Sequence, residues 1–223
     1  RVRSIAMRVG ALPRYPSNAL KYNLTWSTAG LVNEYCNPCE AIAHGRKTEM
    51  PPLEELENFT IDGTEYEAFN TSGGLGTLCE TYAGKVDFLN YRTIRYPGHR
   101  DILKLLLQDL RLQERKDLCQ EIFEHALPTT SQDVVVIFVT VTGEIDGQYT
   151  QHTYARRIFG QKVMGRFFTA IQLTTASGIC TALDLVHARR LPQRGFIRQE
   201  DVTMKDFTEN RFSFAYSEDS STR

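Results

Sequence analysis

One short stretch combines two arginines, two tyrosines and a proline–glycine turn, residue types that suit the binding of an anionic small molecule. It reads Asn90-Tyr91-Arg92-Thr93-Ile94-Arg95-Tyr96-Pro97-Gly98-His99. The first part is predicted to be a strand, on which Arg92 and Arg95 point to opposite faces, so only one of them can face a given cleft. Arg95 is the candidate because it stands at the strand end, where sites are often built, and its guanidinium can bind a carboxylate bidentately. A structural or surface ion pair is the open alternative for either arginine.

A second candidate is the glycine-rich loop Thr71-Ser72-Gly73-Gly74-Leu75-Gly76-Thr77. Such a loop, entering a helix, could present backbone N–H groups to a carboxylate or phosphate. The pattern matches neither the Rossmann Gly-x-Gly-x-x-Gly nor the Walker loop. A plain turn stays open as well, because glycine is the usual residue wherever φ must be positive.

Three further residue types could carry chemistry. Trp26, the single tryptophan, precedes a predicted helix and either walls a cleft or fills the core. Cys36 and Cys39 have Cys-x-x-Cys spacing, but without a second pair they do not favour zinc or redox chemistry. The five histidines lack metal-binding spacing, and only His99 stands out, through its neighbours. No metal site is predicted.

Hydrophobic periodicity predicts the elements that position these residues. Alternation of Ile5, Met7 and Val9 predicts a strand from Val2 to Leu12. Further predicted elements are hairpins over 40–49, 59–69 and 134–158, a helix capped by Ser27, amphipathic helices over 102–110 and 118–123, and a helix over about 168–188. This order predicts an α+β fold in which an antiparallel or mixed β-sheet is covered by helices on one face. Residues 217–223 are expected to fray.

Composition narrows the class of protein. The 223 residues suffice for one large domain, and 41% apolar residues, 24% charged residues and a net charge of −1 do not favour a nucleic-acid partner. The longest apolar run, 134–139, is too short for a membrane span. Five scattered cysteines indicate a reducing cytoplasm. Because the chain starts with Arg1-Val2 and has no initiator Met, we expect a boundary before residue 1.

Three ordered motifs resemble the C-terminal domain of the saccharopine dehydrogenase and lysine dehydrogenase-like family. They are Gly10-Ala11-Leu12-Pro13, similar to Gly-Gly-Leu-Pro; Tyr22 to Gly30, similar to Tyr-x-x-x-Trp-Ser-x-x-Gly; and Thr93 to Gly98, similar to Thr-Leu-Arg-Tyr-x-Gly. The resemblance covers nearly the whole chain. It implies a fold like the C-terminal domain of saccharopine reductase and of glyceraldehyde-3-phosphate dehydrogenase-like enzymes, with residues 1–223 as one domain and the nucleotide-binding domain absent from this chain.

The resemblance also implies a function. The chain would be the substrate-binding and oligomerisation domain of an NAD(P)-dependent oxidoreductase that acts on a C–N bond of a lysine-related amino acid. NAD or NADP would be held by a Rossmann domain of the same protein, with no cofactor in this chain, and a homodimer is expected. The alternative is a stand-alone ligand-binding or structural dimerisation module without catalysis.

Site residues follow from this resemblance together with the local motifs described above. The substrate-binding candidates are Trp26, Thr77, Thr93, Ile94, Arg95, Tyr96 and His99, and the cofactor-binding candidates are Gly73, Gly74 and Gly76. Two positions depart from the family. Gly-Gly-Leu-Gly stands where relatives often supply an arginine, and Val9 stands where some have a cysteine considered in acid/base chemistry, although valine cannot transfer a proton. The catalytic residue is therefore unknown.

Overall fold

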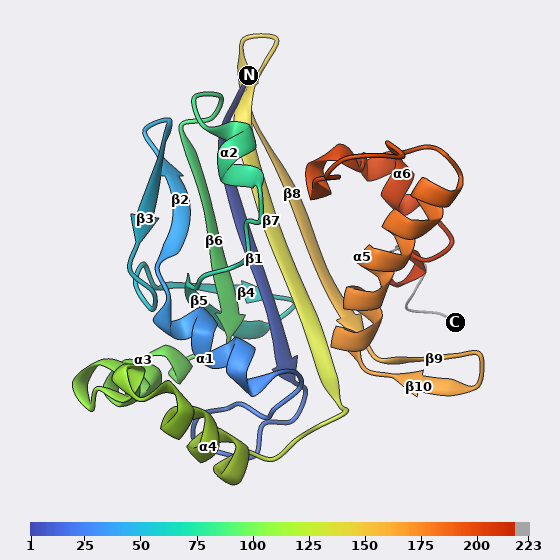
Figure 1. The fold of residues 1–223 in the computed structure, drawn as a ribbon. Coiled ribbons are helices and arrows are strands. Elements are labelled where there is room, and N and C mark those ends of the chain that lie inside the picture. The colour runs from blue at the N-terminus through green and yellow to red at the C-terminus, as the bar shows by residue number, and fades with distance from the viewer. Residues whose placement is uncertain (217–223) are drawn as a thin grey trace.

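The computed structural model describes residues 1–216 and contains one large mixed sheet with helices on one of its faces (Figure 1). The strands are β1 Val2–Pro13, β2 Cys39–Ala43, β3 Arg46–Met50, β4 Glu57–Ile61, β5 Thr64–Asn70, β6 Phe88–Arg95, β7 Asp133–Ile145, β8 Gln148–Phe159, β9 Gln161–Val163 and β10 Arg166–Phe168. The large sheet has eight strands in the order β3-β2-β6-β1-β7-β8, and β5, which carries β4, also pairs with β6. The predicted fold class is confirmed, whereas the predicted fraying at residues 217–223 lies outside the described residues.

The helices come between and after the strands. They are α1 Thr28–Cys36, α2 Leu78–Tyr82, α3 His99–Lys104, a π-helical turn Leu105–Asp109, α4 Lys116–Ala126, α5 Ala170–His187 and α6 Met204–Thr208, with short 3-10 turns at Leu112–Glu114, Gln199–Asp201 and Phe214–Tyr216. As predicted, the Ser27 side chain caps α1, where it accepts a hydrogen bond of 3.2 Å from the Gly30 N–H. None of the helices within residues 1–216 is long and apolar enough to cross a membrane.

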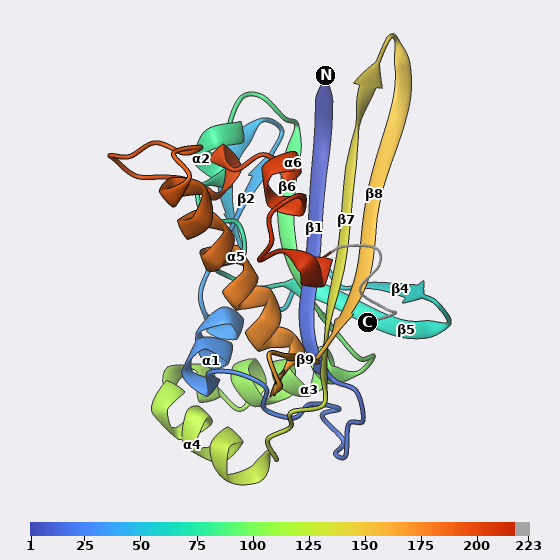
Figure 2. The same ribbon diagram turned by 90° about the vertical axis from the view of Figure 1, so that its right-hand side faces the viewer.

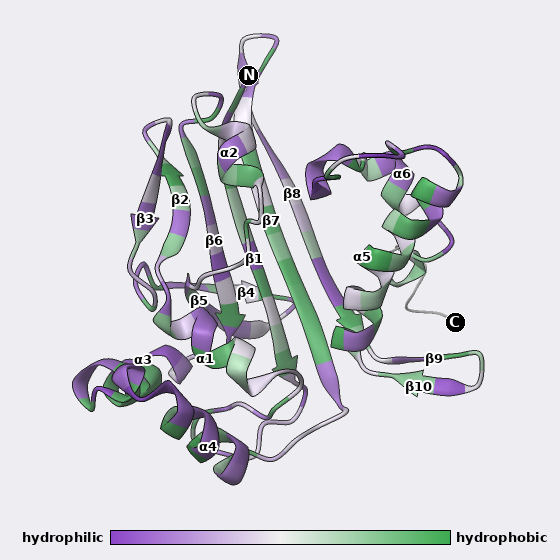
Figure 3. Cartoon of the chain, in the orientation of Figure 1, coloured by the Kyte–Doolittle hydropathy of each residue, from purple (hydrophilic) through white to green (hydrophobic). Residues whose placement is uncertain are grey.

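The centre of the sheet is β1, which runs parallel to β6 and antiparallel to β7. Val9 of β1 lies beside Thr93 of β6, so the residues that point to the helix side alternate in step along both strands. The adjoining β7 is a largely hydrophobic strand (Figure 3). Its hairpin to β8 turns at Asp146-Gly147, both with positive φ, as a two-residue turn requires.

The two faces of the sheet are covered differently (Figure 2). Helices α1, α2 and α5 lie on one side, where Ile5 and Met7 pack against a cluster that includes Cys79 of α2. On the other side the β4–β5 hairpin bends across the sheet, and Tyr66 packs there with Ile94. A side chain on β6 is therefore directed either toward the helices or toward the β4–β5 hairpin.

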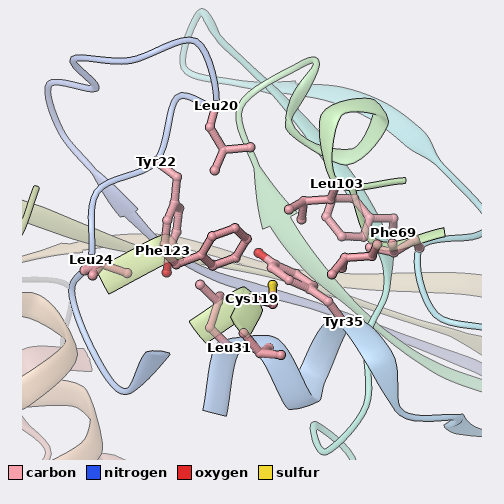
Figure 4. Packing of buried hydrophobic residues seen from close by; sticks show 12 residues of the cluster. Leu20, Tyr22, Leu24, Leu31, Tyr35, Phe69, Leu103, Cys119 and Phe123 are labelled. Carbon is pink, nitrogen blue, oxygen red and sulfur yellow. The ribbon is translucent and has the colours of Figure 1, made fainter. Parts of the chain in front are cut away.

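The structure corrects the expected position of the two amphipathic helices. α3 and α4 were expected to cover a sheet face, but they lie at one end of the sheet and pack against α1 and the loop before it. Leu103 of α3, Phe123 of α4, Leu31 of α1 and Tyr22 of the loop share one buried cluster (Figure 4). An apolar stripe on a helix shows that the stripe is buried, but it does not show which element buries it.

Candidate functional site

Arg95, the last residue of β6, is almost fully buried, with 2% of its surface exposed. Its Nε donates a hydrogen bond to Tyr35 Oη at 2.8 Å, and its Nη1 donates to Thr93 Oγ1 at 2.7 Å and to the Ile94 carbonyl at 2.8 Å. The guanidinium carbon also lies over the Tyr22 ring, 5.1 Å from its centroid. These contacts fix the orientation of the guanidinium, while Nη2 has no hydrogen-bond partner among residues 1–216.

His99 supports this arrangement from the start of α3. Its Nδ1 lies 2.8 Å from the Leu20 carbonyl, and its Nε2 lies 3.0 Å from Tyr35 Oη. Because a carbonyl can only accept, Nδ1 carries the proton, and the neutral Nε2 accepts from Tyr35. Burial, together with the charge of Arg95 beside it, lowers the pKa of His99 to about 3. His99 is thus neutral near pH 7 and orients Tyr35, which in turn orients Arg95.

Trp26 joins the same network from the loop before α1. Its Nε1 donates to Tyr22 Oη at 3.1 Å, and the Tyr22 ring stacks on the Arg95 guanidinium. The indole lies so close to Gly30 that a Cβ on that residue would be 2.6 Å from it. Trp26 also lines an open groove of about 510 Å³ together with Phe168 and the first turns of α5.

The structure brings together only part of the predicted substrate-binding set. Thr93, Arg95 and His99 share hydrogen bonds with each other or with Tyr35, and Trp26 reaches them through Tyr22. The remaining candidates on β6 and in the turn after it do not share this position.

Ile94 and Tyr96 lie on the opposite face of the sheet, which corrects the expectation that they share a site with Arg95. Ile94 is fully buried beside Leu12, and Tyr96 donates its hydroxyl to the Pro13 carbonyl at 2.9 Å. The physical reason is the alternation of side chains along a strand, which places neighbours of Arg95 on the other face.

The same alternation separates the two arginines, as their spacing predicted. Arg92 faces the β4–β5 side and pairs with Glu55 at 2.7 Å and with Glu57 at 3.0 Å. Its charge is thus paired with two carboxylates, of which Glu57 is shared with Arg8. Arg95, in contrast, has no ion pair with any residue in the described range 1–216.

The glycine-rich loop has the geometry of a tight turn packed on a ring. A Cβ on Gly74 would lie 2.3 Å from the Tyr91 ring, and Gly73 and Gly76 have φ of +87° and +55°. The Thr77 hydroxyl donates to Glu200 at 2.9 Å, so this candidate lies apart from Arg95. Packing and turn geometry together account for all three glycines.

A dinucleotide does not fit this loop. The helix that follows it, α2, has five residues, too short to offer a phosphate a useful dipole. The cavity beside the loop is about 180 Å³ and is lined by Pro38, Glu40, Thr71, Gly73, Gly74, Leu75, Gly76 and Tyr91, with no lysine or arginine among these described residues. The expectation that Gly73, Gly74 and Gly76 bind the cofactor thus finds no support in the geometry.

Two tyrosines at the centre of the site were not predicted from the sequence. Tyr22 was noted only as part of a motif, although it stands four residues before Trp26. Tyr35 lies on the buried face of α1 with Thr28, Leu31 and Val32, a helical spacing that marks it as inward-pointing. What the spacing could not show is that this face meets Arg95.

The cysteines and other possible ligands form no second site. Within residues 1–216, no group of three His, Cys, Asp or Glu side chains lies close enough to hold a metal ion. Cys36 and Cys39 are free thiols, and burial raises the pKa of Cys39 to about 12, which keeps it protonated and unreactive near pH 7.

A family assignment follows from comparison with known proteins. The sequence profile described as the saccharopine dehydrogenase C-terminal domain matches residues 1–211. The chain belongs to this family. The motifs at Gly10, Trp26 and Arg95 thus lie in a saccharopine dehydrogenase C-terminal domain, as their resemblance implied.

A solved structure supports the fold of this saccharopine dehydrogenase C-terminal domain. The apo, histidine-tagged saccharopine dehydrogenase (L-Glu forming) from Saccharomyces cerevisiae is similar, with a TM-score of 0.67 and 14% sequence identity. The match covers 89% of this chain and 62% of that chain. At this identity the likeness shows the fold alone, and this chain spans less than two thirds of the length of the yeast protein.

Proposed function

We propose that this chain is the substrate-binding domain of an NAD(P)-dependent oxidoreductase that acts on a C–N bond of a lysine-related amino acid, and that Arg95 binds a carboxylate of that substrate. Membership of the saccharopine dehydrogenase C-terminal domain family supports the oxidoreductase context. A family assignment by itself does not identify a binding residue. The role of Arg95 is supported instead by its burial without an ion pair among residues 1–216.

The observation that carries the proposal is a buried cation without an ion pair. Arg95 is 2% exposed and has no carboxylate within ion-pair distance among residues 1–216. Taking a charge out of water is costly unless a counter-charge compensates it. Three hydrogen bonds orient the guanidinium and leave Nη2 free, so an anionic ligand completes the site.

Trp26 and His99 have indirect roles in this proposal. Trp26 holds Tyr22 over the guanidinium and walls the groove beside α5, whereas His99 holds Tyr35. Neither needs to touch the substrate carboxylate. The arrangement pre-orients Arg95, which lowers the entropy lost when the ligand binds.

The cofactor belongs to another part of the proposed enzyme. Since the loop at Gly73 to Gly76 does not fit a dinucleotide, NAD or NADP would bind to a Rossmann domain of the same protein. The proposal includes a homodimer in the cytoplasm, with the amino-acid substrate bound near Arg95. The direction of the reaction and the choice between NAD and NADP are left open.

Steady-state kinetics of the full-length enzyme test the role of Arg95. Arg95→Lys replaces a bidentate donor by a point charge. We expect kcat/KM to fall, by an amount that corresponds to a loss of roughly 2–4 kcal/mol in transition-state binding. Arg92→Lys is the matched control, because Arg92 is neutralised by Glu55 and Glu57 on the other face.

Loss of activity in Arg92→Lys but not in Arg95→Lys would place the site on the opposite face. If wild-type protein binds the amino acid in calorimetry but never turns it over with NAD(P), the alternative of a binding module without catalysis is correct. Circular dichroism of each variant ensures that a folded protein is compared.

A further inference from the structure

The large sheet ends on one side at β8, a strand of 12 residues. Among residues 1–216 its only strand partner is β7, so the outer side of β8 is an open edge. In Figure 2 the upper part of β8 forms the margin of the sheet, and no helix or strand lies beyond it in the part of the chain that the structure describes. An open edge presents unpaired main-chain N–H and C=O groups, which can pair with a strand of another chain.

The other edge strands carry protection that β8 lacks. β3 and β4 have 5 residues each, and β3 bears Arg46, Lys47 and Glu49 and is followed directly by Pro51-Pro52. Short length, charged side chains and proline all hinder pairing with a further strand. Between Gln148 and Ala155, β8 contains no proline and no Lys, Arg, Asp or Glu. β8 is therefore the edge that can accept another strand.

The register of the β7–β8 hairpin identifies the main-chain groups that point outward. The turn at Asp146-Gly147 has two residues, so Ile145 and Gln148 form a hydrogen-bonded pair. In an antiparallel ladder such pairs alternate with pairs that share no hydrogen bond. Every second residue of β8, counted from Gln148, thus bonds to β7, and the residues between them direct N–H and C=O away from the sheet.

Three residues make up the open part of this edge: Tyr149, Gln151 and Thr153. The next outward residue, Ala155, is already occupied, because its carbonyl accepts a hydrogen bond of 3.0 Å from Arg156 Nη1. The three open residues are all exposed, and Tyr149 has 70% of its surface in contact with solvent. Gln151 Nε2 donates to Thr153 Oγ1 at 3.2 Å, which aligns these two side chains along the strand.

The same three side chains share one face of the sheet. Ile158 of β8 packs with α5 on the helix side, and alternation along the strand places Tyr149, Gln151 and Thr153 on the opposite face. None of the three is charged. Two identical strands can therefore pair here without bringing like charges together, which would destabilise the pair.

We propose that β8 pairs with β8 of a second copy of this chain, antiparallel and about a twofold axis at Gln151. Such a contact uses the same strand in both copies, so it closes as a dimer. Pairing of the three open residues forms roughly six hydrogen bonds, two for each facing pair. It also places Tyr149 of each copy opposite Thr153 of the other, a favourable pair of an aromatic and a β-branched residue. The inference rests on the homodimer of the proposed function and adds the strand that joins the two copies.

The mass of the full-length protein, measured by light scattering over a range of concentrations, tests the inference. Gln151→Pro removes an outward N–H and leaves the hydrogen bonds between β7 and β8 in place. Gln151→Lys places two ammonium groups opposite each other at the axis. We expect a dimer for the wild type, and in both variants a dissociation constant roughly tenfold or more higher, because the change acts in both copies.

Matched controls are Asn58→Pro and Asn58→Lys on β4, another edge strand of the same sheet. The turn at Asp62-Gly63 also has two residues, so Asn58 directs its N–H outward just as Gln151 does. Both controls should keep the wild-type dissociation constant. Circular dichroism shows whether each variant is folded, and if Gln151→Pro does not fold, Gln151→Lys decides.

Hydrogen exchange shows whether the dimer is joined through β8. In the wild-type dimer the amides of Gln151 and Thr153 should exchange more slowly than in the Gln151→Lys monomer at Thr153, because pairing protects them from water. Equally fast exchange of the Thr153 amide in both overturns the inference, since the edge would then be open in the dimer.

The outcomes separate this inference from the proposed function. A wild-type dimer that neither Gln151 variant weakens overturns the inference alone, because the copies then meet elsewhere. Equal weakening by the Asn58 controls has the same meaning. A wild-type monomer at all concentrations overturns both the inference and the homodimer. The role of Arg95 is measured independently by the kinetics of Arg95→Lys.

Discussion

Removal of the Tyr35 hydroxyl should destabilise the protein more than a tyrosine-to-phenylalanine change usually does. The hydroxyl accepts from Arg95 Nε at 2.8 Å and donates to His99 Nε2 at 3.0 Å. All three side chains are buried, so water cannot replace the lost partner. Tyr35→Phe therefore leaves one charged donor and one acceptor unsatisfied.

The size of the effect follows from these two groups. An unsatisfied buried hydrogen-bonding group costs about 1–3 kcal/mol, and a charged group costs more, so the free energy of unfolding should fall by roughly 2–5 kcal/mol. Loss of the hydroxyl leaves little empty space, and cavity formation adds little. The matched control is Tyr96→Phe, which removes one hydrogen bond to the Pro13 carbonyl and should cost about 0.5–1.5 kcal/mol.

Equilibrium unfolding in urea, followed by circular dichroism and by the fluorescence of the single tryptophan, measures both variants. Trp26 reports on the site itself, since its Nε1 donates to Tyr22. A destabilisation by Tyr35→Phe no larger than that by Tyr96→Phe would refute the reasoning. It would mean that the hydroxyl does not satisfy Arg95 and His99 in the folded protein.

Two other predictions concern stability. The pKa of His99 is about 3 in the folded state, below the ordinary value of about 6.5. The stability that comes from burying neutral His99 is therefore complete above about pH 6.5 and is lost as the pH falls toward 3. Between pH 7 and pH 5 the wild type should thus lose about 2 kcal/mol that His99→Gln does not lose, as urea unfolding at both pH values will show. Gly74→Ala should lower the melting temperature, because its Cβ would lie 2.3 Å from the Tyr91 ring, whereas Gly178→Ala, with no atom within 4 Å on the exposed side of α5, should raise it. Shifts of the same sign in the two melting curves would contradict the packing argument.

Local signals in the sequence identified the elements of the sheet. Alternation of Ile5, Met7 and Val9 placed β1, and Ser27 placed the start of α1. These signals act between neighbours in the chain. They are therefore readable without knowledge of the rest of the fold.

Some local structure was still missed. The hairpin of β9 and β10 turns at Met164-Gly165, where Met164 has a φ of +49°. Methionine seldom adopts this conformation, so the residue does not predict a turn. No element was predicted between the helix that ends near residue 188 and the C-terminal residues 217–223. This segment contains α6, and Gln199 and Glu200 bind the glycine-rich loop more than one hundred residues away.

The sequence predicted some of the residues of the candidate site, but it did not predict which side chains come together. Arg95 and Trp26 were found through motifs, and the spacing of the arginines correctly separated Arg92 from Arg95. The partners that define the site are Tyr35, sixty residues before Arg95 in the chain, and Tyr22, which lies earlier still. Only the packing of α1 on β6 brings them together, and no single-sequence periodicity specifies which helix face meets which strand.

The most direct measurement of the central claim is a crystal structure of the full-length protein with a bound amino-acid substrate. A substrate carboxylate oxygen should lie about 3 Å from Nη2 of Arg95, with Tyr35 and Thr93 still bonded to the other guanidinium nitrogens. A carboxylate bound elsewhere, with Arg95 closed in its present contacts and Nη2 unpaired, would contradict it.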